Sequence, residues 1–394
     1  MNSSALCHRP TRLLPGMAGG LALIFSLGTA AAPASSPGPI TRYTGEVTGV
    51  SAVSPSDAWA VGYAGSGNLA LHWDGTAWTK EMSPSPGRPG LDLLNGVSAL
   101  SPSSGGWAVG SYQTASGGNK TLALRWNGAT WAQVACPSPE VTDGSFLLGV
   151  SAVSPADAWA VGWYYLSGGE SSNTLALHWN GTRWAVAHSP NPVRFSFNVL
   201  NGVSALSGSD AWAVGSYQSA TGSQRTLILH WNGTGWARVA SPDPGGHDDS
   251  YLSAVSALSP DNAWAAGYDI TGSGQQSLIL HWNGARWTQV PSPGPPGGAV
   301  SGLSAVSPSD AWAVGSYVTN TSGTLVDKTL VLHWNGTAWA VVASPDPGGT
   351  AGTALLGVSA LSPSDVWATG AADSDSLSPR TLILHWNGAR WSRS

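Results

Sequence analysis

Cysteine and charge are both scarce in this chain of 394 residues, which has 2 cysteines and only 9% charged residues. Cys7 lies ahead of an N-terminal apolar run, so only Cys136 remains if that segment is removed, and no internal disulfide can form. Stability must therefore come from burial. Lysine occurs only at Lys80, Lys120 and Lys328, without a basic cluster. This argues against a nucleic-acid partner, because neutralising phosphates needs clustered Lys and Arg.

Long hydrophobic runs are absent after residue 34. The apolar run that begins at Met17 follows Arg9 and Arg12 and ends in the A-x-A signature Ala32-Pro33-Ala34. This order predicts a secretory signal peptide over residues 1–34. The alternative is a membrane anchor, for which the run is short and interrupted by glycine. We therefore expect a secreted, extracellular protein without a stable membrane anchor after signal cleavage.

What the chain does contain is a long repeat. The phrase V-S-A-[VL]-S-P-x-D-A-W-A-V-G, a variable stretch, and then T-L-x-L-H-W-N-G-x-x-W return seven times. Successive copies start 47, 53, 53, 52, 48 and 55 residues apart. The starts are Val50, Val97, Val150, Val203, Val255, Leu303 and Val358. A fixed period near 50 residues in strand-rich sequence indicates a propeller or a solenoid.

Each copy carries three tryptophans, which account for 21 of the 22 in the chain; only Trp163 lies outside the pattern. The first of each copy are Trp59, Trp107, Trp159, Trp212, Trp264, Trp312 and Trp367. The second are Trp73, Trp126, Trp179, Trp231, Trp282, Trp334 and Trp386, and the third are Trp78, Trp131, Trp184, Trp236, Trp287, Trp339 and Trp391. One buried tryptophan removes roughly 150–250 Å² from water, so three per repeat can replace disulfides.

One repeat reads as four strands. In the first copy they are predicted over 49–54, 58–63 and 69–73 and from Trp78 to Ser83, separated by turn residues. The Asp-Gly or Asn-Gly pair before the last strand predicts a two-residue type I′ turn. With such a turn Trp73 would oppose Thr76 and Leu71 would oppose Trp78, which leaves Trp73 and Trp78 as diagonal neighbours on one face.

These observations predict an all-β, seven-bladed β-propeller with four antiparallel strands per blade. An open β-solenoid is the alternative, but its coils do not need a tight hairpin in every repeat. Residues 35–47 form a lead-in that could supply a closure strand, and the propeller spans 48–394. The blades are expected at about 48–94, 95–147, 148–200, 201–252, 253–300, 301–355 and 356–394.

Six repeats place a histidine before the second tryptophan: His72, His178, His230, His281, His333 and His385. Equivalent positions in different blades spread around a ring, so these histidines should not converge on a metal ion, and no cofactor is expected. Instead, a turn aspartate at the same end of the sheet predicts a structural Asp–His hydrogen bond in five blades. The pairs are Asp57–His72, Asp157–His178, Asp210–His230, Asp310–His333 and Asp365–His385. The second blade has Arg125 instead of His, and the fifth has Asn262 instead of Asp.

A strand, A-W-A-V-G, and then a hairpin with [DN]-G-x-x-W resembles the Asp-box and kelch-like group of secreted bacterial propellers. The repeat is similar to that of photosystem II assembly-factor-type propellers and to the Asp-box of sialidases, over about 48–394. Only Asp74 keeps the turn aspartate, and the other copies have Asn. The arginine cluster of sialidases and the Tyr-Cys crosslink of kelch-type copper oxidases have no counterpart here. The resemblance therefore implies the fold and no specific activity.

Variation between the repeats falls in the loops between the second and third strands and in the connections between blades. In a propeller both sets emerge on one face, and function in scaffolded folds usually lies on such loops; drift of unconstrained loops is the alternative. Exposed aromatic rings beside polar groups suit carbohydrate recognition. The predicted ligand-binding residues on this variable-loop face are Trp163, Tyr164, Tyr165, Phe195, Phe197 and Tyr251.

The sequence thus favours a secreted, monomeric, non-enzymatic propeller that binds an extracellular glycan or protein. The alternative is a hydrolase or lyase acting on polysaccharide, which would need two loop carboxylates converging near the channel mouth. Asp243, Asp248 and Asp249 could together hold calcium, but they lack a known calcium-loop motif. No catalytic residue and no metal ligand is predicted.

Overall fold

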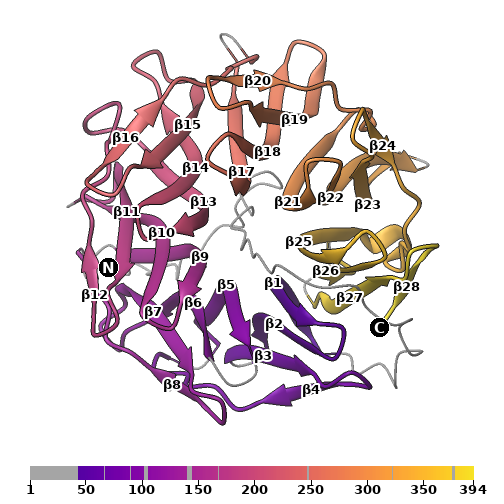
Figure 1. Cartoon of the computed structure of the whole chain (residues 1–394). Helices are drawn as coiled ribbons and strands as arrows, with labels where there is room; N and C mark the ends of the chain where they lie inside the picture. Colours follow the sequence, from indigo (N-terminus) through magenta and orange to yellow (C-terminus); the bar gives the residue numbers. More distant parts are fainter. Residues whose placement is uncertain are drawn as a thin grey trace, which may run out of the picture.

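The computed structural model describes residues 43–394, apart from 66, 89, 102–104, 140–143, 167, 246–247, 322 and 375–377. Seven four-stranded antiparallel sheets surround a central axis as blades (Figure 1), which confirms the predicted fold class. The predicted signal peptide lies outside the described residues. Within the described residues, no helix is long and apolar enough to cross a membrane.

Strands pair in chain order within each blade, from the innermost to the outermost. Blades one and two contain β1 (Gly45–Ser54), β2 (Asp57–Ala64), β3 (Gly67–Trp73), β4 (Trp78–Glu81), β5 (Asp92–Ser101), β6 (Gly105–Gln113), β7 (Asn119–Trp126) and β8 (Trp131–Gln133). Blades three and four contain β9 (Ser145–Ser154), β10 (Asp157–Tyr165), β11 (Ser172–Trp179), β12 (Trp184–Val186), β13 (Asn198–Ser207), β14 (Asp210–Gln218), β15 (Gln224–Trp231) and β16 (Trp236–Val239). Blade five contains β17 (Ser250–Ser259), β18 (Asn262–Thr271), β19 (Gly274–Trp282) and β20 (Trp287–Gln289). Blades six and seven contain β21 (Gly298–Ser307), β22 (Asp310–Thr321), β23 (Thr324–Trp334), β24 (Trp339–Val341), the 3₁₀ turn η1 (Gly349–Ala351), β25 (Thr353–Ser362), β26 (Asp365–Ala372), β27 (Arg380–Trp386) and β28 (Trp391–Arg393).

The innermost strand of each blade is longer than predicted because it contains a β-bulge. In blade one the register shifts between Val47 and Gly49, so Val47 and Val50 are both fully buried although they are three residues apart. The extra residue breaks the period of two that identifies a strand in sequence. The prediction began this strand at residue 49, whereas it begins at Gly45.

The glycine of A-W-A-V-G is required by close backbone contact with this bulge. A Cβ added to Gly62 would lie 1.9 Å from the carbonyl oxygen of Glu46, and the equivalent clash recurs in all seven blades. Any other residue would force the two inner strands of a blade apart.

The V-S-A phrase joins neighbouring blades in a closed ring of hydrogen bonds. Its serine hydroxyl accepts the backbone N–H of the alanine in the next blade, and both groups are largely buried. The seven Ala N–Ser Oγ distances are Ala99–Ser51 2.9 Å, Ala152–Ser98 3.0 Å, Ala205–Ser151 3.0 Å, Ala257–Ser204 3.1 Å, Ala305–Ser256 3.0 Å, Ala360–Ser304 3.1 Å and Ala52–Ser359 3.1 Å. The last of these closes the ring between blades seven and one.

Tryptophans interlock the same neighbours. The first tryptophan of each blade packs against the second and third of the next blade; Trp312, for example, lies 5.2 Å from Trp386 and 5.6 Å from Trp391 between ring centroids. Trp367 of blade seven contacts Trp73 and Trp78 of blade one in the same way, at 5.1 and 5.2 Å. Three tryptophans per repeat therefore build one cluster at every interface, including the closing one.

The end of the lead-in adds to closure. Thr44 forms an antiparallel bridge with Arg380 of β27, and the Gly45 N–H donates to the Pro379 oxygen at 2.7 Å. The Thr381 N–H donates in turn to the Tyr43 oxygen at 2.9 Å. This contact is a short bridge to the third strand of blade seven. The ring is also closed by the Ala52–Ser359 hydrogen bond and by the packing of Trp367 on Trp73 and Trp78.

The predicted hairpin register was wrong by two residues. Trp73 pairs directly with Trp78, their ring centroids lie 5.9 Å apart, and four residues form the loop. Asp74 Oδ1 accepts the N–H groups of Thr76 at 2.8 Å and Ala77 at 2.9 Å, so a side chain closes the turn. Only Gly75, at φ +91°, then needs the left-handed region, unlike a type I′ turn.

Candidate functional site

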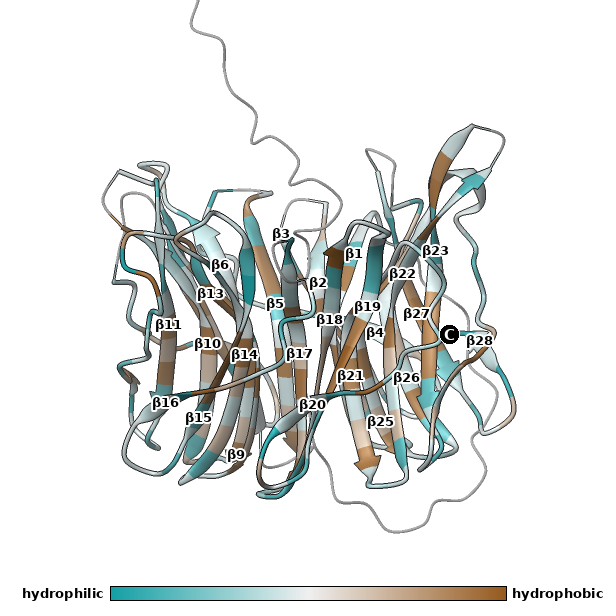
Figure 2. Ribbon diagram, turned by 90° about the horizontal axis from the view of Figure 1, so that it is seen from above, coloured by the Kyte–Doolittle hydropathy of each residue, from teal (hydrophilic) through white to brown (hydrophobic). Residues whose placement is uncertain are grey.

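The propeller has two unlike ends. We call the end bearing the β1–β2-type and β3–β4-type turns the constant face, and the opposite end, with the β2–β3-type hairpins and the interblade connections, the variable-loop face (Figure 2). Hairpins and connections touch on the variable-loop face. The Ser172 N–H donates to the Ser196 oxygen at 3.0 Å, and the Gln218 N–H donates to the Phe197 oxygen at 2.7 Å. The connection between blades three and four thus lies between two hairpins.

The constant face holds the Asp–His pairs. Nε2 of His72, His178, His230 and His385 lies 2.8 Å from an oxygen of Asp57, Asp157, Asp210 and Asp365, and His333 lies 3.1 Å from Asp310. In blade five, His281 lies 3.0 Å from Asn262 Oδ1. Each imidazole also packs on the first tryptophan of its own blade at 4.2–4.4 Å. Among the described residues, no three His, Cys, Asp or Glu gather as metal ligands.

In blade two an arginine packs on the first tryptophan where the other blades have a histidine. Arg125 replaces the histidine, and its guanidinium lies 5.6 Å from the Trp107 ring and 5.4 Å from the Trp179 ring. Arg125 also donates to the Pro155 oxygen at 3.2 Å. The six histidines and Arg125 of the constant face therefore all have partners within the protein.

Polar side chains at the start of the inner strands hold the variable loops. Asp92 accepts the Gly87 N–H at 2.9 Å, Ser250 accepts that of Gly245 at 3.1 Å, and Thr353 accepts that of Gly348 at 2.8 Å. Asn198 occupies the equivalent place in blade four and is fully buried. Sequence reasoning missed these residues, because the bulge hid the start of the strand to which each belongs.

Trp163 lies in an aromatic cluster of blade three. Its ring stacks on Phe146 across β9 and β10 at 4.5 Å and 25°, and Tyr165 meets it edge-on at 4.8 Å and 89°. All three side chains are partly buried. Phe146 was missed because the cross-strand partner of Trp163 depends on the bulged register. Trp163 and Tyr165 therefore lie together, but their rings pack against each other and against Phe146.

The remaining predicted residues are placed separately. Tyr164 points to the opposite side of β10, packs against the core between blades two and three, and accepts a hydrogen bond from Asn173 at 3.2 Å. Tyr251 lies in blade five, stacked 4.7 Å from Tyr268, and donates to Asp249 at 3.2 Å. The predicted residues therefore do not form one site.

Phe195 and Phe197 are the most accessible of the predicted ligand-binding residues. Their side chains are 70% and 38% exposed, on the connection between blades three and four. Arg194 is exposed beside them, and its guanidinium lies 4.8 Å from the Phe195 ring centroid.

Large exposed apolar side chains concentrate on the variable-loop face. Six of nine lie there: Leu91, Phe195, Phe197, Ile270, Val318 and Leu325. The other three, Met82, Val186 and Val341, lie on or just after outermost strands. The constant-face turns have none, as far as the structure describes them. Val318 and Leu325 belong to the β22–β23 hairpin, which pairs out to Thr321 and Thr324 and rises above the face (Figure 2).

Most acidic groups of this face are engaged locally. Asp243 pairs with Arg225 at 2.6 Å, Asp346 pairs with Lys328 at 2.6 Å, and Asp249 accepts the Gln224 N–H at 2.8 Å. Asp243 and Asp249, two of the three aspartates considered for calcium, are therefore each bonded to a protein group. Burial raises the pKa of Asp269 on β18, and it also raises the pKa of Glu46 on the innermost strand, where the Tyr63 hydroxyl partly offsets it.

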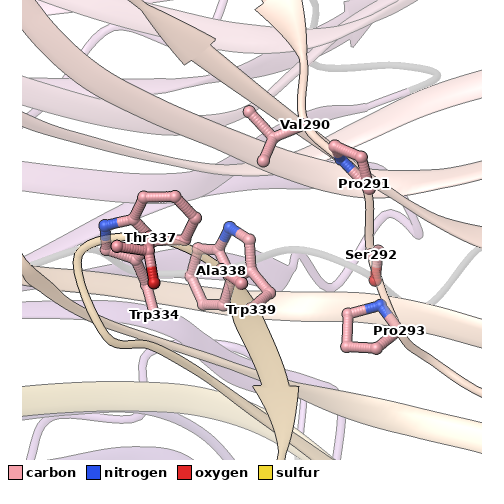
Figure 3. Close-up of a pocket in the computed structure, with 8 residues that line it drawn as sticks. All are labelled: Val290, Pro291, Ser292, Pro293, Trp334, Thr337, Ala338 and Trp339. Atoms are coloured by element: carbon pink, nitrogen blue, oxygen red, sulfur yellow. The ribbon is translucent and has the colours of Figure 1, made fainter.

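A shallow cavity of about 250 Å³ lies between blades five and six, away from these groups (Figure 3). Val290–Pro293 line one side, and Trp334, Thr337, Ala338 and Trp339 line the other. Both tryptophans belong to the repeat, so the cavity is a gap in the structural frame. We do not assign it to ligand binding.

Comparison with known proteins finds similar folds among solved structures. No family model matches the chain, and no curated protein matches it. Among solved structures, YCF48 bound to D1 peptide is 15% identical, with 90% of this chain and 97% of that chain covered and a TM-score of 0.52. A polysaccharide lyase of family PL25, an ulvan lyase bound to -[GlcA(1-4)Rha3S]-, is 10% identical over 89% and 96%, with a TM-score of 0.51. The GH74 xyloglucanase from Xanthomonas campestris is 15% identical over 90% of this chain and 55% of that chain, with a TM-score of 0.52. At these identities the likenesses support a propeller repeat protein and no more.

Proposed function

We propose that the chain is a secreted, non-enzymatic propeller of the Asp-box and kelch-like kind that binds an extracellular glycan or protein through its variable-loop face. The observation that carries the proposal is the unequal distribution of exposed apolar side chains, six of which lie on that face. Exposed apolar groups that lie together mark interaction sites, and this face has two on one interblade connection, Phe195 and Phe197, and two on one hairpin, Val318 and Leu325. The leader-like residues 1–34 support an extracellular location.

Paired substitutions on the two faces test this proposal. Leu325→Ser and Phe197→Ser change the variable-loop face, and Arg286→Gln changes an exposed side chain at a constant-face turn. Glycan-array and protein-array binding are measured for the wild type and each variant. We expect binding to fall with the first two and to stay at the wild-type level with Arg286→Gln. Equal losses with all three, or a loss with Arg286→Gln alone, would contradict the proposal.

A second candidate is a polysaccharide hydrolase or lyase. The buried carboxyl of Glu46 favours it, because burial raises the pKa of this group and a general acid needs a carboxyl pKa above the ordinary value. Glu46 lies on β1, the strand nearest the central axis. Release of reducing ends or unsaturated products from a polysaccharide panel, abolished by Glu46→Gln, would establish this activity.

A further inference from the structure

The connection between blades three and four contains a residue in a strained conformation. Only two non-glycine residues have a positive φ in the described part of the chain, Phe195 and Asp373, both at 57°. Aspartate tolerates this region, and Asp373 is ion-paired with Arg380. For a bulky residue such as phenylalanine it is an outlier, and strain of this kind clusters at functional sites. Phe195 gains little from the core in return, since its side chain is 70% exposed.

The surrounding loop is held in place by buried hydrogen bonds. Nδ2 of Asn198, itself fully buried, lies 3.0 Å from the Val193 oxygen and 3.1 Å from the Ser196 oxygen. Ser196 is also buried, and its hydroxyl donates to the Gln218 oxygen at 2.9 Å. These bonds fix the backbone on both sides of Phe195. A rigid loop that presents an aromatic ring loses little conformational entropy when a partner binds.

The neighbouring cation gives the loop a defined chemistry. The Arg194 guanidinium covers the Phe195 ring at 4.8 Å, is exposed, and has no ion-pair partner among the described residues. Aromatic residues, phenylalanine included, and arginine are enriched at the cores of protein interfaces. A partner that fits would have an apolar pocket for the ring with a carboxylate at its edge.

The composition of the rest of the face favours a polypeptide over a glycan. Its other exposed apolar residues, apart from Phe197, are aliphatic: Leu91, Ile270, Val318 and Leu325. Sugar rings stack on open aromatic faces, but the Trp163 ring stacks on Phe146, and the Phe195 ring has the Arg194 guanidinium over it. The exposed apolar residues also belong to several blades, which suits a partner of macromolecular size.

We propose that the Arg194–Phe195 tip is the anchor by which the variable-loop face binds an acidic, apolar segment of a polypeptide partner. This rests on the proposed function and names its ligand class. The anchor inserts Phe195 into an apolar pocket, and Arg194 pairs with a carboxylate of the partner.

The test uses the full chain without its first 34 residues and a random dodecapeptide library displayed on phage, selected on the wild type. Enriched peptides are synthesised, and their affinities are measured calorimetrically for wild type, Phe195→Asn, Arg194→Gln and Val341→Asn. We expect peptides that combine apolar and acidic residues. Phe195→Asn should weaken binding roughly 30-fold, as expected for a hot spot. Arg194→Gln should weaken it about fivefold at low salt and less at high salt. Val341→Asn, which changes an exposed apolar residue on an outermost strand, should leave affinity unchanged.

Thermal unfolding distinguishes a binding role of Phe195 from a structural one. Asparagine accepts the left-handed region, so Phe195→Asn should unfold at the wild-type temperature or up to about 2 °C above it. A fall of several degrees would make Phe195 a structural residue and overturn the proposal. Peptides that bind Phe195→Asn as tightly as wild type would also overturn it. Glycan-array binding lost in Phe195→Asn, with no peptide enriched, would replace the polypeptide with a glycan.

The two proposals fail differently. If binding survives Phe195→Asn but is lost with Leu325→Ser, the face binds through another anchor and only the inference about this tip fails. If no substitution on the variable-loop face changes binding, the proposed function fails with it.

Discussion

The two ends of the propeller differ although the same strands run between them. At the constant face, Asp57 and His72 and their equivalents bond to each other, and the histidines pack on buried tryptophans. At the variable-loop face, the blades differ in hairpin length, Phe195 is strained, and apolar side chains face solvent. The repeated residues therefore build the ring and its constant face, whereas the loops of the variable-loop face differ between blades. A closed ring is stable only if every interface between blades is stable, whereas the loops can change without opening the ring.

Removing a tryptophan at each end should show the largest difference. Trp312, 1% exposed, contacts Trp386, Trp391 and His333, so Trp312→Ala should lower the free energy of unfolding by about 3–5 kcal/mol. Trp163 is only partly buried, and Trp163→Ala should cost about 1–2 kcal/mol. Urea unfolding followed by circular dichroism measures both. Equal costs would mean that the variable end is as important to cohesion as the repeat frame.

The most buried Asp–His pair should show a smaller effect, with a control that the chain itself provides. Asp365→Ala leaves a buried imidazole without its partner and should cost about 1–3 kcal/mol. Asp365→Asn copies blade five, where Asn262 accepts from His281, and should stay within about 0.5 kcal/mol of wild type. Both are measured by urea unfolding. If the two variants lose equal stability, the charge of the carboxylate matters more than its acceptor oxygen.

The sequence predicts the frame of this molecule better than its candidate site, for a physical reason. Copies of one phrase constrain each other, so the blade number, the sheet order and the sharing of a face by Trp73 and Trp78 follow from repetition. The bulge before Gly49 is a local exception to the strand pattern and hid the start of the innermost strand, and the side-chain-closed turn at Asp74 shifted the predicted hairpin register by two residues. The stacking of Trp163 on Phe146 depends on the equivalent bulge in blade three. The strain at Phe195 is a backbone angle that no residue pattern encodes.

Blade five offers a pH test of the constant face. Burial lowers the pKa of His281, which has Asn262 in place of an aspartate. A histidine with a lowered folded pKa contributes full stability above the unfolded value of about 6.5, and stability falls as pH drops below it. Asn262→Asp should raise the pKa of His281 and reduce this loss between pH 6.5 and 5. Histidine Cε1–H shifts in NMR titrations report the pKa directly, and an unchanged value would contradict the role assigned to the carboxylate.

The smallest effect is expected at the constant-face turn of blade one, the only copy with Asp instead of Asn. Hydrogen bonds from the Thr76 hydroxyl and from the Ala77 and Thr76 N–H groups lower the pKa of Asp74 to about 2. A lowered carboxyl pKa stabilises the fold above the unfolded value of about 3.9, and this contribution is lost as pH falls through about 2. Asp74→Asn keeps the acceptor oxygen that Asn127 uses in blade two, where it takes the Ala129 and Thr130 N–H groups at 3.0 and 2.9 Å. The variant should therefore match wild type at neutral pH and lose less stability between pH 4 and 2. Thermal unfolding across that range measures the difference, and parallel curves would show that the turn is insensitive to the charge of its first residue.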